Sequence, residues 1–233
     1  MPKLGRQAGQ NIRKLALKRR MKAVTSFASA GFVFFLPIFL VKTFDKLLRQ
    51  LSPNNSSQPQ SSLNWSPILY VPFIVIALGL ATNAVFLWKQ ANNADQGAEG
   101  EESIGKEISQ LEHEGWQVEY GMYLGNKLGD ADIVCISPQN KAYVIDVKSH
   151  KGKVTTDGKQ LYRCMGRTKY PFEKDFIAQT MRQALQVKKQ KGFNFVTPIL
   201  AFSDAKVSLP SEKLRKVYVV EKSKLTSLLK FLG

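Results

Sequence analysis

The sequence AYVIDVKSHKGKV occupies residues Ala142–Val154 and places an acid and a lysine within a strongly apolar run. Its first half predicts a β-strand over Ala142–Lys148. Asp146 and Lys148 are two residues apart, so on a strand their side chains leave the same face of the sheet. Upstream, the sequence DIVCIS at Asp132–Ser137 predicts a second strand, joined to the first by a short Pro-Gln-Asn-Lys turn.

The acids at the ends of these two strands suggest a metal site. A short turn makes the strands antiparallel neighbours, so Asp132 and Asp146 can converge at one end of a sheet with Lys148 beside them. Carboxylate oxygens suit a hard cation, Mg²⁺ or Mn²⁺, that polarises a phosphodiester and acidifies a bound water. Lys148 would orient that water or steady charge on the phosphate. The alternative from spacing alone is a solvated salt bridge without chemistry.

The surrounding sequence predicts an α/β domain of about 135 residues, which is long enough to bury a core. Apolar residues at helical spacing predict helices over Glu101–Glu114, Phe172–Lys191 and Ser223–Leu232. Further strands are expected over Trp116–Tyr123, Lys159–Met165, Phe195–Phe202 and Lys216–Val220. Without the short additional strand at Lys159–Met165, the expected order is αβββαβ followed by βα.

Two uncharged apolar runs precede this domain, Ala23–Val41 and Pro67–Trp88. Each is close to the roughly 20 residues that a helix needs to cross a bilayer, and the polar stretch Ser52–Ser66 predicts a short loop between them. Eight Lys and Arg and no acid precede the first run, against three between the two runs, namely Lys42, Lys46 and Arg49. This asymmetry predicts a cytoplasmic N-terminus, and two crossings return the chain to the cytoplasm.

The expected organisation has three parts. Residues 1–22 are a basic cytoplasmic N-terminus, residues 23–91 a two-helix transmembrane hairpin, and residues 92–233 the α/β domain, entered through a polar linker at Asn92–Gly100. No A-x-A-like site follows the first run, which argues against a cleaved signal peptide. The basic, acid-poor first 44 residues leave an organelle transit peptide open as an alternative. The lipid bilayer is thus one expected partner.

Positive charge is distributed unevenly along the chain. The net charge of +16 divides into +10 for residues 1–95 and +6 for residues 96–233, so most of the excess flanks the apolar runs. Residues 148–191 nevertheless hold twelve Lys and Arg against three acids, which suits contact with a phosphate backbone. A solvated basic face is the open alternative. The candidate nucleic-acid contacts are Lys151, Lys153, Arg163, Arg167, Lys169 and Arg182.

Two further residue classes are informative. Tyr162, Tyr170 and Phe172 lie among these cations and either stack on unpaired bases or belong to the core. Cys135 and Cys164 are the only cysteines and form no CxxC motif, so we expect reduced thiols and no zinc site.

Several segments together resemble the nuclease-related domain (NERD) branch of the PD-(D/E)XK nuclease-like superfamily. They are GAEGEE at 97–102, GDADIV at 129–134, the Ala142–Val154 segment and a glutamine-bearing helix, in that order. The resemblance covers roughly Gly97–Phe202 and none of the first 95 residues. It implies a restriction-endonuclease-like αβββαβ core with a mixed sheet.

The resemblance also implies roles for individual residues. Asp132 would be the principal metal ligand, Asp146 the second ligand and Glu101 an accessory acid near the metal. Lys148 would be the catalytic lysine, and the glutamine of the family's helix falls on Gln179. Three neighbours stay open as alternatives at these positions: Asp130 for Asp132, Glu102 for Glu101 and Gln183 for Gln179.

The sequence therefore predicts a membrane-anchored, metal-dependent nuclease that hydrolyses phosphodiester bonds of DNA, which we favour over RNA, through an activated water. A non-catalytic nucleic-acid-binding or sensing module with the same fold is the main competing function. A membrane scaffold whose domain binds protein is a third. The sequence carries no signal for an oligomeric state.

Overall fold

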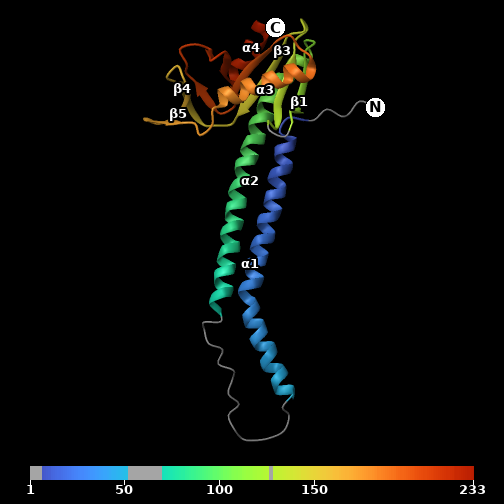
Figure 1. Cartoon of the computed structure of the whole chain (residues 1–233), viewed down its shortest axis with the longest axis vertical. Coiled ribbons are helices and arrows are strands. Elements are labelled where there is room, and N and C mark those ends of the chain that lie inside the picture. The colour runs from blue at the N-terminus through green and yellow to red at the C-terminus, as the bar shows by residue number, and fades with distance from the viewer. Residues whose placement is uncertain (1–6, 52–69, 126–127) are drawn as a thin grey trace, which may run out of the picture. The chain divides into compact units, whose positions relative to one another are not determined.

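The computed structural model describes residues 7–51, 70–125 and 128–233 (Figure 1). It divides the chain into two compact units. Residues Leu15–Asn93 form a helical unit, and the residues up to Lys14 together with Ala94–Gly233 form an α/β unit. The expected loop Ser52–Ser66 lies outside the described residues.

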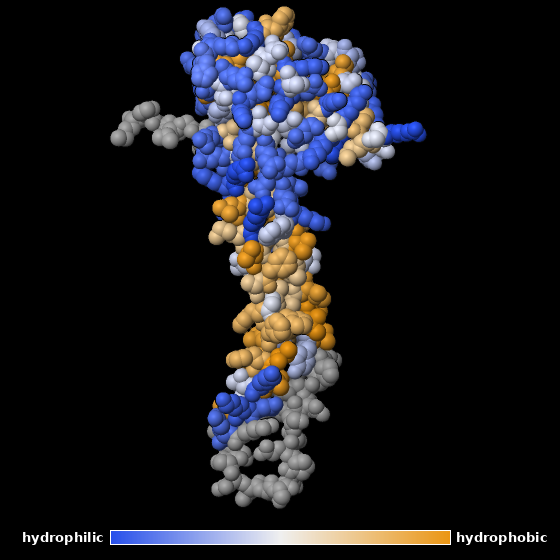
Figure 2. Space-filling view, turned by 180° about the vertical axis from the view of Figure 1, so that it is seen from behind, coloured by the Kyte–Doolittle hydropathy of each residue, from blue (hydrophilic) through white to orange (hydrophobic). Residues whose placement is uncertain are grey.

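Two long helices, α1 (Gln10–Leu51) and α2 (Val71–Glu112), supply the helical unit. Both are long and apolar enough to cross a membrane, and only 11% of either apolar window is buried. Figure 2 shows a band of apolar side chains over the two helices, and Phe35, Phe39 and Val75 are all more than 60% exposed. Exposed apolar surface of this extent is typical of an interaction or membrane surface rather than a solvated one.

Small residues line the inner faces of these helices. Alanines recur every seven residues at Ala16, Ala23 and Ala30 and at Ala77, Ala84 and Ala91, all at most 7% exposed. Side chains this small let helix backbones approach closely. The Ser26 hydroxyl consequently donates to the Leu80 carbonyl at 2.8 Å, and the Arg19 guanidinium donates to the Gln90 carbonyl at 3.2 Å.

A six-stranded mixed sheet forms the centre of the α/β unit. Its order is β1-β2-β3-β7-β10-β9, with β3, β7 and β10 parallel to one another and the other pairs antiparallel. The strands are β1 (Gln117–Tyr123), β2 (Asp130–Ile136), β3 (Ala142–Lys148), β7 (Val196–Phe202), β9 (Lys213–Leu214) and β10 (Val217–Glu221). The end of α2, β1–β3, α3 and β7 follow the expected αβββαβ order, and the α/β fold is confirmed.

Helices cover both faces of this sheet. On one face, Ile104 of α2 and Leu225 of α4 (Lys222–Leu232) pack with Ile145. On the other face, Val187 of α3 (Phe176–Lys191) packs with Val144, and Figure 1 shows α3 lying across the strands. Strand β3 is therefore enclosed from both sides, which explains its nearly continuous apolar sequence.

A second, four-stranded sheet was only partly expected. Strand β5 (Leu161–Met165) lies close to its expected position, but its neighbours β4 (Gly152–Thr156), β6 (Thr168–Pro171) and β8 (Ala205–Val207) were not predicted. The order is β6-β5-β4-β8, with β4 and β8 parallel. Strand β4 follows β3 and β8 follows β7, and β3 and β7 are themselves parallel neighbours. The pairing of these short polar strands is therefore set by the tertiary structure, which overrides their weak local propensity to form strands.

Two expected boundaries are wrong. Residues Asn92–Gly100 are not a linker, because α2 continues through them and Gln96 donates to the Ser149 carbonyl at 2.7 Å. Helix α3 begins at Phe176 rather than Phe172, because the Asp175 carboxylate caps it by accepting the Ala178 N–H at 3.0 Å.

Gly100 allows α2 to approach the ends of β3 and β7. A Cβ at this position would lie 2.8 Å from both the Ser149 Cβ and the Ser203 Oγ. By contrast, a Cβ at Gly97 of the same helix would lie 3.9 Å from Ile12, an ordinary contact. The approach at Gly100 brings this turn of α2, including Glu101, to the ends of the central strands.

We predict opposite effects for alanine at these two glycines. Gly97→Ala should raise the free energy of unfolding by up to about 1 kcal/mol, because alanine favours a helix. Gly100→Ala should lower it by about 1–3 kcal/mol, because the added methyl overpacks the contact with β3 and β7. Denaturant unfolding of the full chain in detergent measures both. Equal effects of the two substitutions would contradict the close approach at Gly100.

Candidate active site

Asp146 and Lys148 form a buried ion pair at the C-terminal end of β3. The Asp146 side chain is 1% exposed and that of Lys148 is 16% exposed. The Lys148 Nζ lies 2.9 Å from Oδ1 and 2.7 Å from Oδ2 of Asp146. The two-residue spacing on a strand thus brings acid and ammonium together on the α3 side of the sheet.

Asp132 lies beside this pair on the neighbouring strand. Strands β2 and β3 are antiparallel with Ile133 opposite Ile145, and one further step along each strand reaches Asp132 and Asp146. The Asp132 Oδ2 accepts the Val147 N–H at 2.7 Å, which ties its carboxylate to β3. Its alternative, Asp130, instead accepts a hydrogen bond from the Asn11 side chain at 2.9 Å.

Helix α2 brings a third carboxylate to the cluster. Glu101 is buried at 9% exposure, one turn before the core residue Ile104, and its Oε2 accepts the Gly9 N–H at 3.1 Å. Its alternative, Glu102, is a surface residue that forms an ion pair with Arg13. Gly9 and Arg13 therefore connect the N-terminal part of the α/β unit to both acids. No local sequence pattern could indicate the Gly9 contact, since it joins positions 92 residues apart.

Helix α3 covers Asp146 with amides and a hydroxyl. Gln179 Nε2 lies 3.4 Å from Asp146 Oδ1, and Thr180 Oγ1 lies 3.4 Å from Asp146 Oδ2. Gln183 is 2% exposed and donates to the Asp130 carbonyl at 3.3 Å. Both glutamines thus lie close to the cluster, and their roles stay predictions. Thr180 was missed, although it directly follows Gln179 and precedes Gln183 by one helical turn.

Burial and mutual repulsion make these acids hard to ionise. Burial raises the pKa of Asp132 well above its usual range, and the charges of Asp146 and Glu101 raise it further. Burial also raises the pKa of Asp146, against the opposing charge of Lys148. The pKa of Glu101 is raised by burial, while the Gly9 N–H and the Lys148 charge oppose the shift. Three acids that resist ionisation together would gain from a nearby cation.

The donor set fits Mg²⁺, although the described part of the chain holds no group of three or more His, Cys, Asp or Glu side chains placed to bind a metal ion. Mg²⁺ is usually held by one or two carboxylates, waters and substrate oxygens rather than by a closed protein cage. Asp132 and Asp146 supply such oxygens. Within the described residues, the buried Gln183 Oε1 accepts no hydrogen bond, so a metal-bound water could donate to it.

The six candidate nucleic-acid contacts do not form one surface. Arg163 pairs with Tyr170 across β5 and β6, and both side chains line a hollow beside Lys148. Lys153 and Lys169 both pair with Cys164, so they lie on the opposite face of this small sheet. The remaining three, Lys151, Arg167 and Arg182, are exposed before β4, in the β5–β6 turn and on α3.

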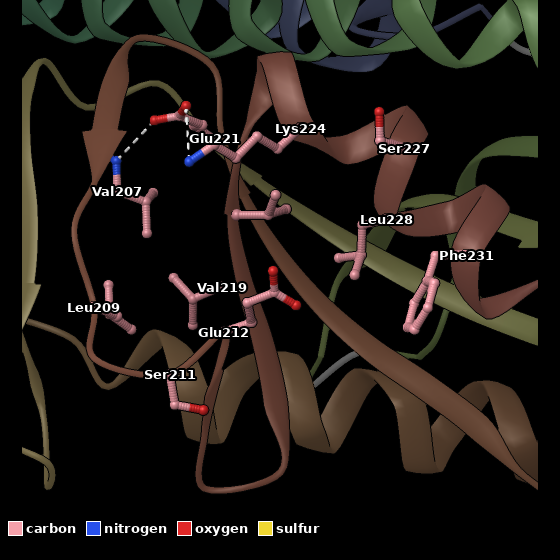
Figure 3. Close-up of a pocket in the computed structure, with 11 residues that line it drawn as sticks. Val207, Leu209, Ser211, Glu212, Val219, Glu221, Lys224, Ser227, Leu228 and Phe231 are labelled. Carbon is pink, nitrogen blue, oxygen red and sulfur yellow. Dashed lines mark hydrogen bonds and ion pairs between the residues drawn. The ribbon is translucent and has the colours of Figure 1, made fainter.

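A second pocket lies apart from the carboxylates, between β8, β10 and α4 (Figure 3). Its lining is largely apolar and includes Leu209, Val219 and Leu228. Glu221 at its edge accepts the Val207 N–H at 3.1 Å and forms an ion pair with Lys224 at 3.5 Å. Both of these contacts fix the wall of the pocket, and none of its lining residues belongs to the cluster around Asp146.

The raised pKa of Asp132 predicts that its charge destabilises the metal-free fold. Wild-type stability should fall as pH rises through that raised pKa, and recover as pH falls toward the unfolded value of about 3.9. Asp132→Asn keeps an oxygen for the Val147 N–H but removes the charge. We expect it to exceed wild type by about 0.5–2 kcal/mol at pH 8, with the difference shrinking toward pH 4.

Denaturant unfolding of the full chain in EDTA, at several pH values, measures this difference. The matched control is Asp130→Asn, whose carboxylate bonds to Asn11 rather than to β3. A difference of the same size and pH dependence in both variants would contradict the argument.

The family model for the nuclease-related domain matches residues 96–203. This range contains Glu101, Asp132, Asp146, Lys148 and Gln179, and it ends one residue after β7. No curated protein and no solved structure matches the chain. Residues 96–203 are therefore a nuclease-related domain of the NERD family, and this range begins within α2, the second of two helices that are apolar enough to span a membrane.

Proposed function

We propose that this protein is a membrane-anchored, Mg²⁺- or Mn²⁺-dependent nuclease that hydrolyses phosphodiester bonds of DNA, with RNA as a second possible substrate. One observation carries the proposal: Asp132, Asp146 and Lys148 meet at the end of two adjacent strands, within a nuclease-related domain. Two carboxylates with an ammonium beside them can bind a cation and a phosphate at one place.

Each residue then has a defined task. Asp132 and Asp146 hold the metal, which when bound polarises the phosphodiester and lowers the pKa of a coordinated water. Glu101 adds negative charge at the same point and is fixed by the Gly9 N–H. Gln179 donates to one oxygen of the Asp146 carboxylate, and the Thr180 hydroxyl, which donates to the Phe176 carbonyl at 2.8 Å, lies 3.4 Å from the other.

Lys148 provides the positive charge that the reaction needs at the phosphate. Hydrolysis adds a water oxygen to phosphorus and releases the leaving oxygen, and negative charge builds on the phosphoryl oxygens in between. The Lys148 ammonium, which is held on Asp146 and lies 5.0 Å from the centre of the Phe176 ring, can stabilise that charge or orient the water.

A non-catalytic nucleic-acid-binding or sensing module is the alternative, and one observation favours it. Lys148 contacts both oxygens of Asp146, so it competes with a metal for the same carboxylate. If that ion pair persisted in the presence of metal, the domain would bind a backbone without cutting it. The two functions differ in whether the Asp146 carboxylate releases Lys148 and binds a metal ion.

We further propose that α1 and α2 anchor the domain in a membrane, with the N-terminus and the α/β unit both on the cytoplasmic side. The support is the apolar exposed surface of both helices and the eight Lys and Arg before the first apolar run. The anchor would confine the nuclease to substrates that reach the membrane face.

Cleavage should depend on the cluster and on metal. The full chain in detergent should cut single-stranded or plasmid DNA with Mg²⁺ or Mn²⁺, and EDTA should stop it. Asp146→Asn, which keeps the side-chain shape, and Lys148→Ala should each lower kcat/KM by at least about 100-fold. Because Lys148→Ala leaves a buried charge unpaired, circular dichroism must first show that it is folded.

Asp130→Asn is the matched control for this experiment and should keep wild-type cleavage. Undiminished cutting by folded Asp146→Asn would contradict the proposed chemistry. Undiminished DNA binding by all three variants, with no cutting by wild type, would support the binding module instead.

The anchor predicts a defined orientation. In membrane vesicles, the chain should resist extraction by alkaline carbonate, because two apolar helices cross the bilayer. Added protease should remove the α/β unit from inverted vesicles but not from sealed right-side-out vesicles. Extraction by carbonate would contradict the spans, and digestion from the outer side would contradict the sidedness.

A further inference from the structure

A hollow of about 530 Å³ opens beside the Lys148 side of the cluster. It is lined by Lys148 from β3, by Gln179 from α3, and by Arg163 and Tyr170 from β5 and β6. Lys148 and Gln179 therefore belong both to the carboxylate cluster and to this hollow. A ligand in the hollow would lie next to the group cut at the cluster, and the volume is within the usual range of ligand pockets.

One wall of the hollow is an aromatic cluster supported by the core. The rings of His150 and Phe172 have centroids 5.1 Å apart, and those of Phe172 and Phe176 are also 5.1 Å apart. Phe172 also stacks on the fully buried Phe202, at 6.1 Å and an interplanar angle of 28°. Packing against one another and against Phe202 therefore holds these rings in place along the hollow.

Two further features point to a flat aromatic ligand with a phosphate. Tyr170 is 52% exposed on β6, so its ring is accessible to a ligand. Arg163 is oriented by its Nε, which donates to the Lys151 carbonyl at 2.8 Å, and with Lys148 it brings positive charge to the hollow. His150 belongs to the same wall, and burial and the charges of Arg163 and Lys148 lower its pKa.

We propose that this hollow binds an unpaired nucleobase adjacent to the phosphodiester at the cluster, so that the substrate is single-stranded or carries an unpaired end. The inference rests on the proposed nuclease function and specifies its substrate. Bases inside a duplex have both faces covered by stacking, and only an unpaired base can offer a face to aromatic side chains. Tyr170 and the His150–Phe172–Phe176 wall bind the base, and Arg163 contacts the backbone.

Binding of labelled oligonucleotides to the full chain in detergent, without metal and followed by fluorescence anisotropy, tests this site. The wild-type chain should bind a single strand at least about 10-fold more tightly than the duplex of the same sequence. Tyr170→Ala should weaken single-strand binding by about 5- to 100-fold, the range for loss of one stacked base. Tyr170→Phe, which keeps the ring, should bind like wild type.

Two controls separate base stacking from other effects. Phe195 is an aromatic residue outside the hollow and is 71% exposed, so Phe195→Ala should leave binding unchanged. A DNA strand made entirely of abasic nucleotides should bind the wild-type chain and the Tyr170→Ala variant equally, because it has no base to stack. Equal affinity for single strand and duplex, or an equal loss with the abasic strand, would overturn the inference. The binding assay requires neither metal nor cleavage. If the chain cut no DNA, the proposed nuclease function would be contradicted, and the binding assay would still test this pocket.

Discussion

Asp146 lies at 1% exposure on a strand that is enclosed by helices on both faces. A carboxylate cannot remain charged in such a place without partners. Lys148 supplies the counter-charge, Gln179 supplies a donor from α3, and the Thr180 hydroxyl lies 3.4 Å away. These partners come from β3 and α3, and the approach of α2 at Gly100 brings the charge of Glu101 close to them. Removing one partner of such a buried pair typically costs about 3–5 kcal/mol, so the pair constrains the fold as well as the chemistry.

Asp132, Asp146 and Glu101 lie where a negative charge is unfavourable. Their ionisation destabilises the metal-free fold, and a bound cation would offset that cost. Burial and neighbouring charge both raise the pKa of Asp132. In the proposed function, this cluster lowers the stability of the metal-free fold in return for a metal site, as functional sites commonly do. The N-terminal segment contributes too, since the Gly9 N–H binds Glu101 and Arg13 pairs with Glu102. Residues 7–14 are therefore part of the α/β unit.

Much of this could be predicted from the sequence, for physical reasons. A strand buried on both faces leaves an apolar run, and the i, i+2 spacing of Asp146 and Lys148 fixes their common face. The short turn between β2 and β3 fixes their antiparallel pairing and brings Asp132 to the site. Short polar strands such as β4 and β8 could not be predicted, because their pairing depends on where β3 and β7 end. The helical state of Asn92–Gly100 depends on tertiary contacts to Ser149 and Ser203, and the Gly9–Glu101 contact leaves no local pattern.

The central claim is that Asp132 and Asp146 share one cation. The most direct measurement is the anomalous scattering of Mn²⁺ soaked into crystals of the full chain. We expect one Mn²⁺ peak in contact with carboxylate oxygens of both aspartates, with the Lys148 Nζ moved off at least one oxygen of Asp146. Mn²⁺ bound only elsewhere, with Lys148 still on both oxygens of Asp146, would contradict it.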